Sequence, residues 1–329
     1  MNRRVISLLL LLVLFSTAPV DAAAKKTYFR VGATGDAVGV TLQGGVVLMG
    51  GSTDVDAAFQ WMCARAAGGD FLVVRATGTD AYNPYIRNLC PSANSVATLI
   101  VDSVTAANSA INVAYVQKAE LIWIAGGDQS NYINYWKGTA LQAALKARIA
   151  LGAPVGGTSA GLNVLTQFVY TAQASSGVTS SQALADPFNR YMSFDRDFLN
   201  VGILSGAIGD PHFGARDRMG RDLAFLCRVS ASGWSTAPRA IAVDEQTALL
   251  VAGTSASVVG TGHVYFLRAP GAPEVCRAKT PLTYRNIGVR RIAAGATFDL
   301  SQWSSAAVDY TVTAEAGVLT STQAGGSPY

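Results

Sequence analysis

Histidine is the scarcest reactive side chain in this sequence, whose 329 residues include only His212 and His263. The four cysteines form no Cys-x-x-Cys pair. Protein zinc sites are built from clustered cysteines and histidines, so this shortage argues against a structural or catalytic zinc ion. We therefore expect neither a metal nor a cofactor. Acid–base chemistry that needs an imidazole must use one of these two residues.

Charge is also sparse. Asp, Glu, Lys and Arg make up 14% of the chain, and the formal net charge is only +4. No stretch rich in lysine and arginine is interleaved with aromatic residues, as a nucleic-acid-binding surface would be. We therefore expect no nucleic-acid partner.

Long apolar runs are missing except near the N-terminus. Arg3 and Arg4 precede an apolar run at residues 5–15, and Ala-Ala-Ala follows at 22–24. This pattern predicts a signal peptide at residues 1–24 and a secreted or periplasmic protein with no membrane association after cleavage. The apolar run is shorter than a spanning helix requires, although a retained membrane anchor is the alternative interpretation.

The cysteines are even in number, at positions 63, 90, 227 and 276. In an exported chain they could form two disulfides, and four cysteines allow three pairings that the sequence does not distinguish. Buried free thiols are the alternative.

Short apolar segments alternate with helical patterns through the first half of the chain. This alternation predicts an α/β fold with a parallel sheet covered by helices on both faces. We expect one helix over residues 132–151 and, in the more antiparallel second half, a β-hairpin formed by 240–245 and 248–251. The expected parallel strands lie at 45–51, 71–76, 97–101, 121–125 and directly before Ser159.

Residues 157–161 read Gly-Thr-Ser-Ala-Gly between an apolar strand and a helical run. This G-x-S-x-G pattern is typical of a nucleophile elbow, which would expose the hydroxyl of Ser159. The backbone amide of Ala160 and that of Gly127, in the preceding Gly-Gly turn, could form an oxyanion hole. The alternative is a glycine-rich turn with an incidental serine.

A serine nucleophile needs a base and an acid. His212 follows a strand end at a Gly-Asp-Pro turn, whereas His263 lies within a strand pattern and is expected to be structural. The order nucleophile, acid, base would place the acid between Ser159 and His212, where Asp186 is our first choice. The other candidates in this interval are Asp195, Asp197 and Asp210.

Several motifs, taken together, resemble the dipeptidase E and cyanophycinase family of serine peptidases. The matching segments are Gly-Gly-Asp-Gln at 126–129, Gly-Gly-Thr-Ser-Ala-Gly at 156–161, Asp-Pro-His-Phe at 210–213, the arginines at 216, 218 and 221, and Val-Asp-Glu-x-Thr-Ala at 243–248. The resemblance covers about residues 46–267, in the order found in the family.

The resemblance implies a flavodoxin-like or class I glutamine amidotransferase-like sheet sandwiched by helices. The strand patterns of the second half of the chain predict additional C-terminal antiparallel strands. It implies Ser159 as nucleophile and His212 as base, with Gly127 and Ala160 as oxyanion donors. It also implies that a group of polar residues holds the substrate: Gln129, Asp210, Arg216, Arg218 and Arg221.

Two departures from the family pattern stand out. Cyanophycinases carry a triad glutamate some distance after the serine, but residues 174–185 contain no acidic residue. Pro211 also stands where the cyanophycinase motif usually has glutamine, which removes one side-chain contact to the polymer.

We expect a peptidase domain at residues 25–270 and a β-rich extension at 271–329 packed on the same domain. The expected function is hydrolysis of aspartyl or β-aspartyl bonds through an acyl-enzyme. Its peptide partner would be an aspartyl or β-aspartyl peptide or an Asp-Arg polymer, and a homodimer is left open. The alternative is a non-catalytic or weakened family member that binds an acidic or arginyl peptide. Amidotransferase-type glutamine hydrolysis is disfavoured because the elbow has no cysteine.

Overall fold

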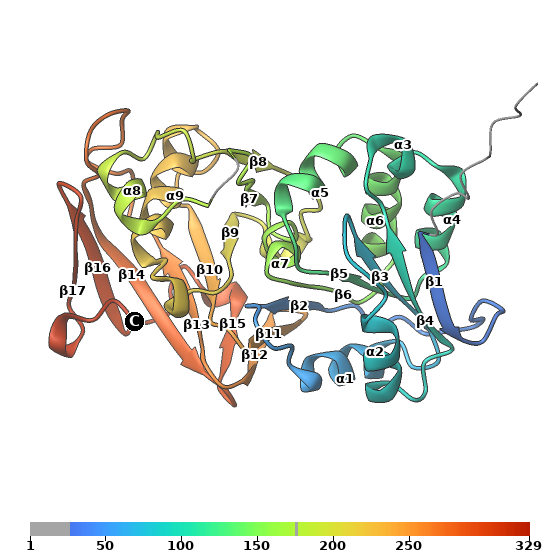
Figure 1. The fold of residues 1–329 in the computed structure, drawn as a ribbon. Helices are drawn as coiled ribbons and strands as arrows, with labels where there is room; N and C mark the ends of the chain where they lie inside the picture. Colours follow the sequence, from blue (N-terminus) through green and yellow to red (C-terminus); the bar gives the residue numbers. More distant parts are fainter. Residues whose placement is uncertain (1–26, 175–176) are drawn as a thin grey trace, which may run out of the picture.

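The computed structural model describes residues 27–174 and 177–329, arranged as two β-sheets with helices around them (Figure 1). The expected signal peptide at residues 1–24 lies outside the described residues. None of the described helices is long and apolar enough to cross a membrane.

The first sheet, here called sheet A, has the strand order β1-β4-β3-β5-β6-β2-β11-β12-β15. Its centre, from β4 to β2, is parallel, and antiparallel strands extend it at both edges. The strands are β1 (Tyr28–Gly32), β2 (Val46–Met49), β3 (Asp70–Arg75), β4 (Ser95–Ile100), β5 (Leu121–Ile124), β6 (Val155–Thr158), β11 (Thr247–Ala252), β12 (Ser255–Gly260) and β15 (Thr297–Asp299).

Helices cover both faces of sheet A. On one face lie α1 (Asp56–Arg65) and α2 (Tyr82–Leu89), and on the other α3 (Val104–Ala107), α4 (Ala110–Lys118), α5 (Gln129–Trp136) and α6 (Ala140–Ala150). Every residue of β2, β4 and β5 is buried, which explains why β2 and β5 are apolar throughout. The α/β fold with a helix-covered parallel sheet is therefore confirmed.

The single helix expected over residues 132–151 is wrong. The chain forms α5 and α6 instead, because Gly138 adopts a left-handed φ of +74° between them. Thr139 then caps α6 by accepting a hydrogen bond from the amide of Gln142.

The second sheet, sheet B, has the order β17-β16-β14-β13-β10-β9-β7-β8 and is mostly antiparallel, with β9 parallel to both β10 and β7. Helices α8 (Ser180–Ala185) and α9 (Met219–Ala231) pack on it. Its strands are β7 (Phe168–Tyr170), β8 (Phe194–Arg196), β9 (Ala207–Asp210), β10 (Arg239–Val243), β13 (His263–Arg268), β14 (Tyr284–Ala293), β16 (Tyr310–Glu315) and β17 (Val318–Ser321).

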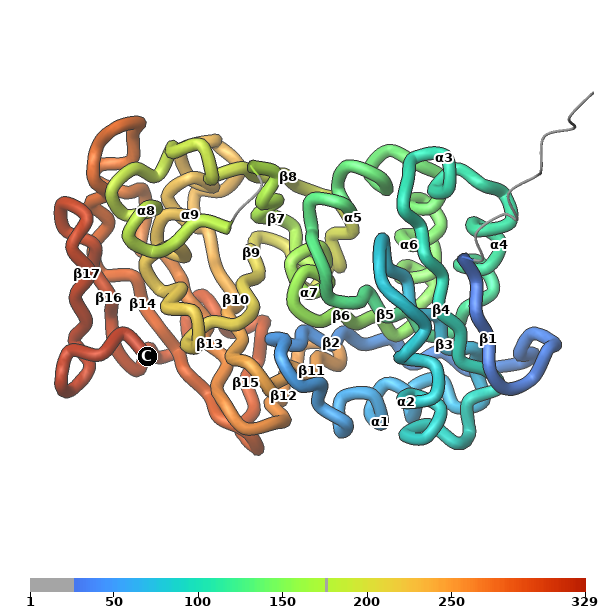
Figure 2. Tube along the Cα trace, in the orientation of Figure 1, coloured from blue at the N-terminus to red at the C-terminus, as the bar shows by residue number. Residues whose placement is uncertain are grey.

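The β-hairpin expected over residues 240–251 is also wrong. β10 pairs with β9 and β13 in sheet B, whereas β11 pairs with β2 and β12 in sheet A. The chain therefore crosses from one sheet to the other at residues 244–246. Figure 2 shows this return, with β11 running beside β2 although about 200 residues separate the two strands in sequence.

Strands after residue 270 contribute to both sheets. β14, β16 and β17 extend sheet B, whereas β15 pairs with β12 in sheet A. The rings of Phe266 in β13 and Phe298 in β15 stack 4.3 Å apart and join the two sheets. The C-terminal strands are thus antiparallel, as expected, while a domain boundary at residue 270 stays a prediction.

Two disulfides resolve the pairing that the sequence left open. Cys63 in α1 bonds to Cys90 at the end of α2, with Cα atoms 5.9 Å apart. Cys227 in α9 bonds to Cys276 in the segment before β14, with Cα atoms 6.0 Å apart. The first bridge joins two helices on one face of sheet A, and the second joins a helix that packs on sheet B to a loop; no described cysteine is a free thiol.

Candidate active site

Ser159 lies at the turn between β6 and α7 (Ala160–Asn163), with φ of 52° and ψ of −115°. A non-glycine residue in such a conformation costs about 1–3 kcal/mol, and such strain is concentrated at functional sites. A Cβ atom on Gly161 would lie 2.0 Å from the carbonyl oxygen of Ile124, so only glycine lets α7 start this close to β5. The pattern G-x-S-x-G therefore forms an elbow, as expected.

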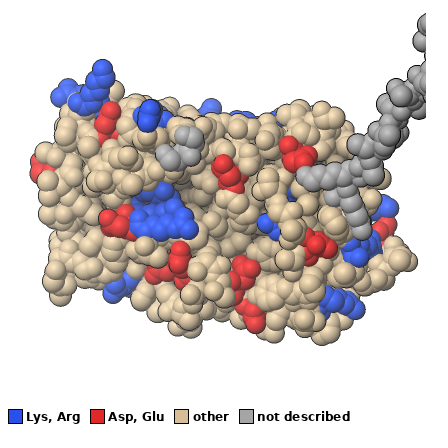
Figure 3. All heavy atoms as spheres, viewed as in Figure 1, with Lys and Arg blue, Asp and Glu red and all other residues tan. Residues whose placement is uncertain are grey.

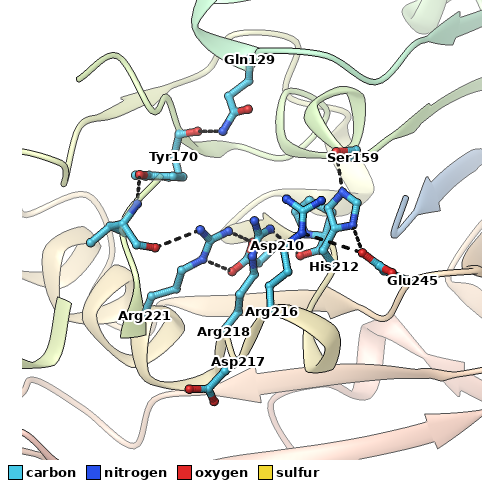
Figure 4. A network of polar contacts seen from close by, with 12 residues as sticks. Gln129, Ser159, Tyr170, Asp210, His212, Arg216, Asp217, Arg218, Arg221 and Glu245 are labelled. Atoms are coloured by element: carbon cyan, nitrogen blue, oxygen red, sulfur yellow. Dashed lines mark hydrogen bonds and ion pairs between the residues drawn. The ribbon is translucent and has the colours of Figure 1, made fainter. Parts of the chain in front are cut away.

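The Oγ atom of Ser159 lies 2.8 Å from Nε2 of His212, on the turn that follows β9 (Figure 4). The turn is anchored on sheet A, because the amide of His212 donates to the carbonyl of Gly50 over 2.8 Å. Gly51 provides the space for the imidazole, since a Cβ atom there would lie 2.4 Å from Cε1 of His212. The structure thus brings together the serine and histidine predicted from the sequence.

Glu245, not Asp186, is the acid next to this histidine. Its Oε1 lies 2.6 Å from Nδ1 of His212. Asp186 ends α8 and accepts a hydrogen bond from the amide of Phe188 over 2.9 Å, which closes the turn around Pro187. Our choice of Asp186 is therefore wrong, because its carboxylate is committed to a local turn.

The acid was missed because we assumed that it must precede His212 in the chain. Triad geometry does not depend on chain order, and the same arrangement occurs in several orders. Glu245 lies at the crossing between the sheets, and the amide of Gln246 donates to the carbonyl of Gly51 over 3.0 Å. The available signal is the pair of acidic residues that follows an apolar strand in the Val-Asp-Glu motif at 243–245.

The electrostatic surroundings keep His212 neutral at physiological pH. Burial lowers its pKa below the ordinary value, the hydrogen bond to Glu245 opposes this change, and the charges of Arg216 and Arg218 lower the pKa further. A neutral imidazole with Nδ1 bonded to a carboxylate presents Nε2 as an acceptor to Ser159. The histidine is therefore in the protonation state that a general base requires.

A cavity of about 260 Å³ opens in front of the serine. Gly127 and Gln129 line it from sheet A, while His212, Arg216 and Arg218 line it from the sheet B side. Figure 3 shows Lys and Arg side chains gathered beside a hollow near the middle of this face. The cavity is therefore suited to an anionic group placed next to Ser159.

The three arginines are not equivalent. Arg221 is buried and holds both carboxylate oxygens of Asp210, with its Nε 2.7 Å from Oδ2. Arg218 donates to Oδ1 of Asp210 over 3.1 Å and to the carbonyl of Pro211 over 2.6 Å. The side chain of Arg216 is 53% exposed, and its Nε lies 3.8 Å from Oε1 of Glu245. Arg216 is therefore the guanidinium with most freedom to meet a ligand.

Asp210 itself has no exposed surface. Burial opposes its ionisation, but attraction to Arg221 and Arg218 outweighs this effect and places its pKa below the ordinary value. A direct contact between Asp210 and a substrate, implied by the family resemblance, is thus not supported. Its contribution passes through the guanidinium groups that it orients.

The remaining predicted residues lie as follows. The side-chain amide of Gln129 lines the cavity and donates to the carbonyl of Tyr170 over 3.3 Å. Ala160 is buried at the start of α7, directly after the nucleophile. His263 lies in β13 with its Nδ1 3.7 Å from Asp244, outside the cavity lining. Among residues 27–174 and 177–329, no three His, Cys, Asp or Glu side chains gather where they could hold a metal ion.

Comparison with known protein families shows to which family this chain belongs. The model of peptidase family S51 matches residues 76–259, more than half of the chain, and the match contains Ser159, His212 and Glu245. The chain belongs to peptidase family S51. This match supports the assignment, suggested by the motifs, of the chain as a serine-type peptidase of the cyanophycinase and dipeptidase E group.

Individual relatives of this S51 chain agree with that family. A cyanophycinase from Geminocystis herdmanii is 34% identical over 113 residues, which cover 34% of this chain and 38% of that protein. The match therefore spans well under half of the cyanophycinase. A solved peptidase structure from an acI-B1 actinobacterium superposes with a TM-score of 0.51 at 16% identity, covering 78% of this chain and 97% of that one. At this identity the likeness shows the fold alone.

Proposed function

We propose that this S51 chain hydrolyses aspartyl or β-aspartyl peptide bonds through an acyl-enzyme on Ser159. The observation that carries the proposal is the continuous hydrogen-bonded chain from Ser159 through His212 to Glu245 beside an arginine-lined cavity. Each of the three groups has the chemical character that its role requires: a strained, presented hydroxyl, a neutral imidazole and a carboxylate on Nδ1.

In the first half-reaction, Oγ of Ser159 attacks the scissile carbonyl carbon while Nε2 of His212 takes its proton. Glu245 stabilises the imidazolium through Nδ1. We expect the backbone amides of Gly127 and Ala160 to donate hydrogen bonds to the developing oxyanion. As the tetrahedral intermediate collapses, the C–N bond breaks and His212 passes its proton to the leaving nitrogen.

In the second half-reaction, a water molecule replaces the leaving amine. His212 takes one proton from this water, and the resulting hydroxide attacks the ester carbonyl. Breaking the ester bond returns the proton to Ser159 and releases the acyl fragment as a carboxylic acid. No metal or cofactor enters this sequence of steps.

An acidic residue on the acyl side of the scissile bond would suit the cavity. Its carboxylate could accept charge-assisted hydrogen bonds from Arg216 and from the nitrogens of Arg218 that do not contact Asp210. Gln129 could bind a substrate amide or carboxylate from the opposite wall. Pro211 lines the cavity without a polar side chain, which weakens the expectation of a cyanophycin-specific contact there. The substrate range therefore includes small aspartyl peptides as well as an Asp-Arg polymer.

Export belongs to the same proposal. The pattern at residues 1–24 predicts a signal peptide, and two disulfides among the described residues are typical of an oxidising compartment. Expression of the tagged full-length chain, followed by cell fractionation and N-terminal sequencing of the purified protein, would reveal whether cleavage occurs near Ala24. Recovery of uncleaved protein in the cytoplasm would contradict export.

The direct test is incubation with cyanophycin and a matched set of α-aspartyl, β-aspartyl and glutamyl dipeptides, with products identified by mass. Hydrolysis of the aspartyl members is expected. Cleavage of the glutamyl or neutral peptides at equal rates would contradict the proposed specificity.

A non-catalytic binding role is the second candidate, and its basis in the sequence is the absence of an acidic residue at 174–185. Glu245 removes that reason. Labelling with a fluorophosphonate separates the two candidates, because only an activated serine reacts stoichiometrically. Binding of the peptides without labelling or turnover would favour the binding role.

A further inference from the structure

A second cavity, of about 180 Å³, lies on the α1 and α2 side of sheet A. Asp54, Arg75, Ala81, Tyr82 and Tyr85 line it, and none of them lines the cavity in front of Ser159. The proposed reaction steps use none of these side chains, so the second cavity could bind a part of a ligand that lies away from the reacting bond.

The walls of this second cavity adjoin the turns that build the active site. Asp54 lies three residues after Gly51 in the sequence, and Gly51 packs against the ring of His212. Arg75 ends β3, and the amide of Ala125 donates to the carbonyl of Val74 over 3.1 Å. Because neighbouring strands lie about 5 Å apart, Arg75 stands beside the chain that continues into Gly126 and Gly127. The cavity is therefore at the same carboxyl edge of the sheet as the nucleophile.

The cavity holds two opposite charges that do not neutralise each other. Neither Asp54 nor Arg75 forms an ion pair within the described part of the chain. Among residues 27–174 and 177–329, Arg75 donates only to the backbone carbonyls of Thr77, over 2.5 Å, and Thr79, over 3.0 Å. Burial raises the pKa of Asp54, and a bond from the hydroxyl of Tyr82 only partly offsets it. Because the Asp54 carboxylate and the Arg75 guanidinium line one cavity without pairing, each can form a charge-assisted hydrogen bond to a ligand group of opposite charge.

The aromatic wall is rigid. The hydroxyl of Tyr85 donates to Oδ1 of Asp56 over 2.5 Å, and its ring packs edge-on against Phe59 at 5.5 Å. The ring of Tyr82 lies 6.0 Å from the same Phe59. Tyrosine rings beside a carboxylate are a common environment for ammonium and guanidinium groups. The Asp54 side of the cavity is thus suited to a cation and the Arg75 side to a carboxylate.

We propose that this second cavity binds the residue on the leaving-group side of the scissile bond, and that this residue carries a cationic side chain and a free carboxylate. In an intact peptide its α-nitrogen belongs to the scissile amide, so the positive charge must come from the side chain. The inference rests on the proposed function, and it assigns the two cavities to the two sides of one peptide.

Three dipeptides isolate the two charges: aspartyl-lysine, aspartyl-norleucine without the side-chain cation, and aspartyl-lysinamide without the carboxylate. Loss of either charge should lower kcat/KM about tenfold, the usual worth of a hydrogen bond to a charged group. In Asp54→Asn the ratio between the lysine and norleucine substrates should fall towards one. In Arg75→Gln the ratio of kcat/KM between aspartyl-lysine and aspartyl-lysinamide should also fall towards one.

Asp80→Asn is the matched control, because Asp80 is a neighbouring carboxylate that does not line the cavity. It should keep both ratios. Equal ratios in wild type, or ratios that Asp54→Asn and Arg75→Gln leave unchanged, would overturn the proposal. Thermal unfolding of each variant identifies any that fails to fold.

Binding to the Ser159→Ala protein separates this inference from the proposed function. Calorimetry should show aspartyl-lysine binding about tenfold more tightly than the other two dipeptides, and Asp54→Asn in the same background should remove the preference over norleucine. If wild type hydrolyses no dipeptide but this preference holds, the proposed function fails, while the second cavity still stands as a site for a ligand that carries a cation and a carboxylate. Turnover without any such preference, or no binding at all, overturns the assignment.

Discussion

The two sheets contribute to the active site in different ways. Sheet A supplies Ser159 and Gly127 from tight turns at the ends of adjacent parallel strands, and each position follows from residues next to it in sequence. The sheet B side supplies His212, which has a φ of 51° and is anchored on Gly50 of the other sheet. The nucleophile is thus a product of local geometry, whereas the base depends on contacts between distant segments.

The two sides also differ in polarity. The elbow is surrounded by small and apolar residues, whereas the base stands in front of a buried ionic cluster formed by Asp210, Arg218 and Arg221. Removing one member of a buried ion pair typically costs 3–5 kcal/mol, because the remaining charge stays desolvated. Ion pairs with the buried Asp210 therefore fix the positions of Arg218 and Arg221, whereas close backbone packing fixes the position of the elbow.

The most severe change on the sheet A side is Ser159→Ala. We expect turnover to fall about 10⁶-fold, as in other serine peptidases that lose the nucleophile, with stability nearly unchanged. Peptide hydrolysis and fluorophosphonate labelling measure the effect. A variant that still labels or hydrolyses at the wild-type rate would exclude Ser159 as the nucleophile.

Glu245→Gln tests the residue at the crossing between the sheets. The amide cannot stabilise the imidazolium, so kcat should fall about 10³–10⁴-fold. Asp186→Asn is the control and should change kcat less than twofold, since Asp186 only closes a local turn. A large loss in Asp186→Asn with full activity in Glu245→Gln would reverse our assignment.

Gly51→Ala tests the contact through which sheet A positions the base. The added Cβ would lie 2.4 Å from the ring of His212, and displacement of the ring should lower kcat about 100-fold. Gly68→Ala imposes a similar backbone strain at φ of +80° but meets no atom within 4 Å. It should lower the unfolding midpoint and leave kcat unchanged. Equal activities of the two variants would argue against this positioning role.

Arg216→Gln tests the electrostatic contribution of the sheet B side. Arg216 lowers the pKa of His212, so removing its charge should raise that pKa and move the acid limb of kcat/KM to higher pH. Wild-type activity should fall as the pH drops through the His212 pKa, below its ordinary value near 6.5. Arg216→Lys should keep the wild-type midpoint. A shift to lower pH in Arg216→Gln would contradict the electrostatic account.

The smallest expected difference concerns the two disulfides. Cys227–Cys276 closes a longer segment than Cys63–Cys90, with sequence separations of 49 and 27. Loop entropy then makes the sheet B bridge more stabilising by about 0.5 kcal/mol, out of about 4 kcal/mol each. Denaturant unfolding of the paired Cys→Ser variants measures both. A larger loss for Cys63–Cys90 would show that local packing outweighs loop length.

Much of the sheet A side could be predicted from the sequence. Apolar strands buried on both faces have a recognisable pattern, and the glycines around Ser159 are required by contacts within one β-turn-α unit. The helix break at Gly138 was missed because a single glycine does not reveal whether a helix continues through it. Its left-handed φ becomes evident only in the fold.

The sequence by itself determined the helix-covered parallel sheet, the strained elbow at Ser159 and the choice of His212, because these depend on local spacing and on the scarcity of histidine. Only the tertiary structure decided the acid and the cysteine pairing. Residues 240–251 have the pattern of a hairpin, yet β10 and β11 join different sheets, since each finds its hydrogen-bonding partners among strands distant in sequence. That separation places Glu245 beside His212, a contact between residues 33 positions apart that no local pattern specifies.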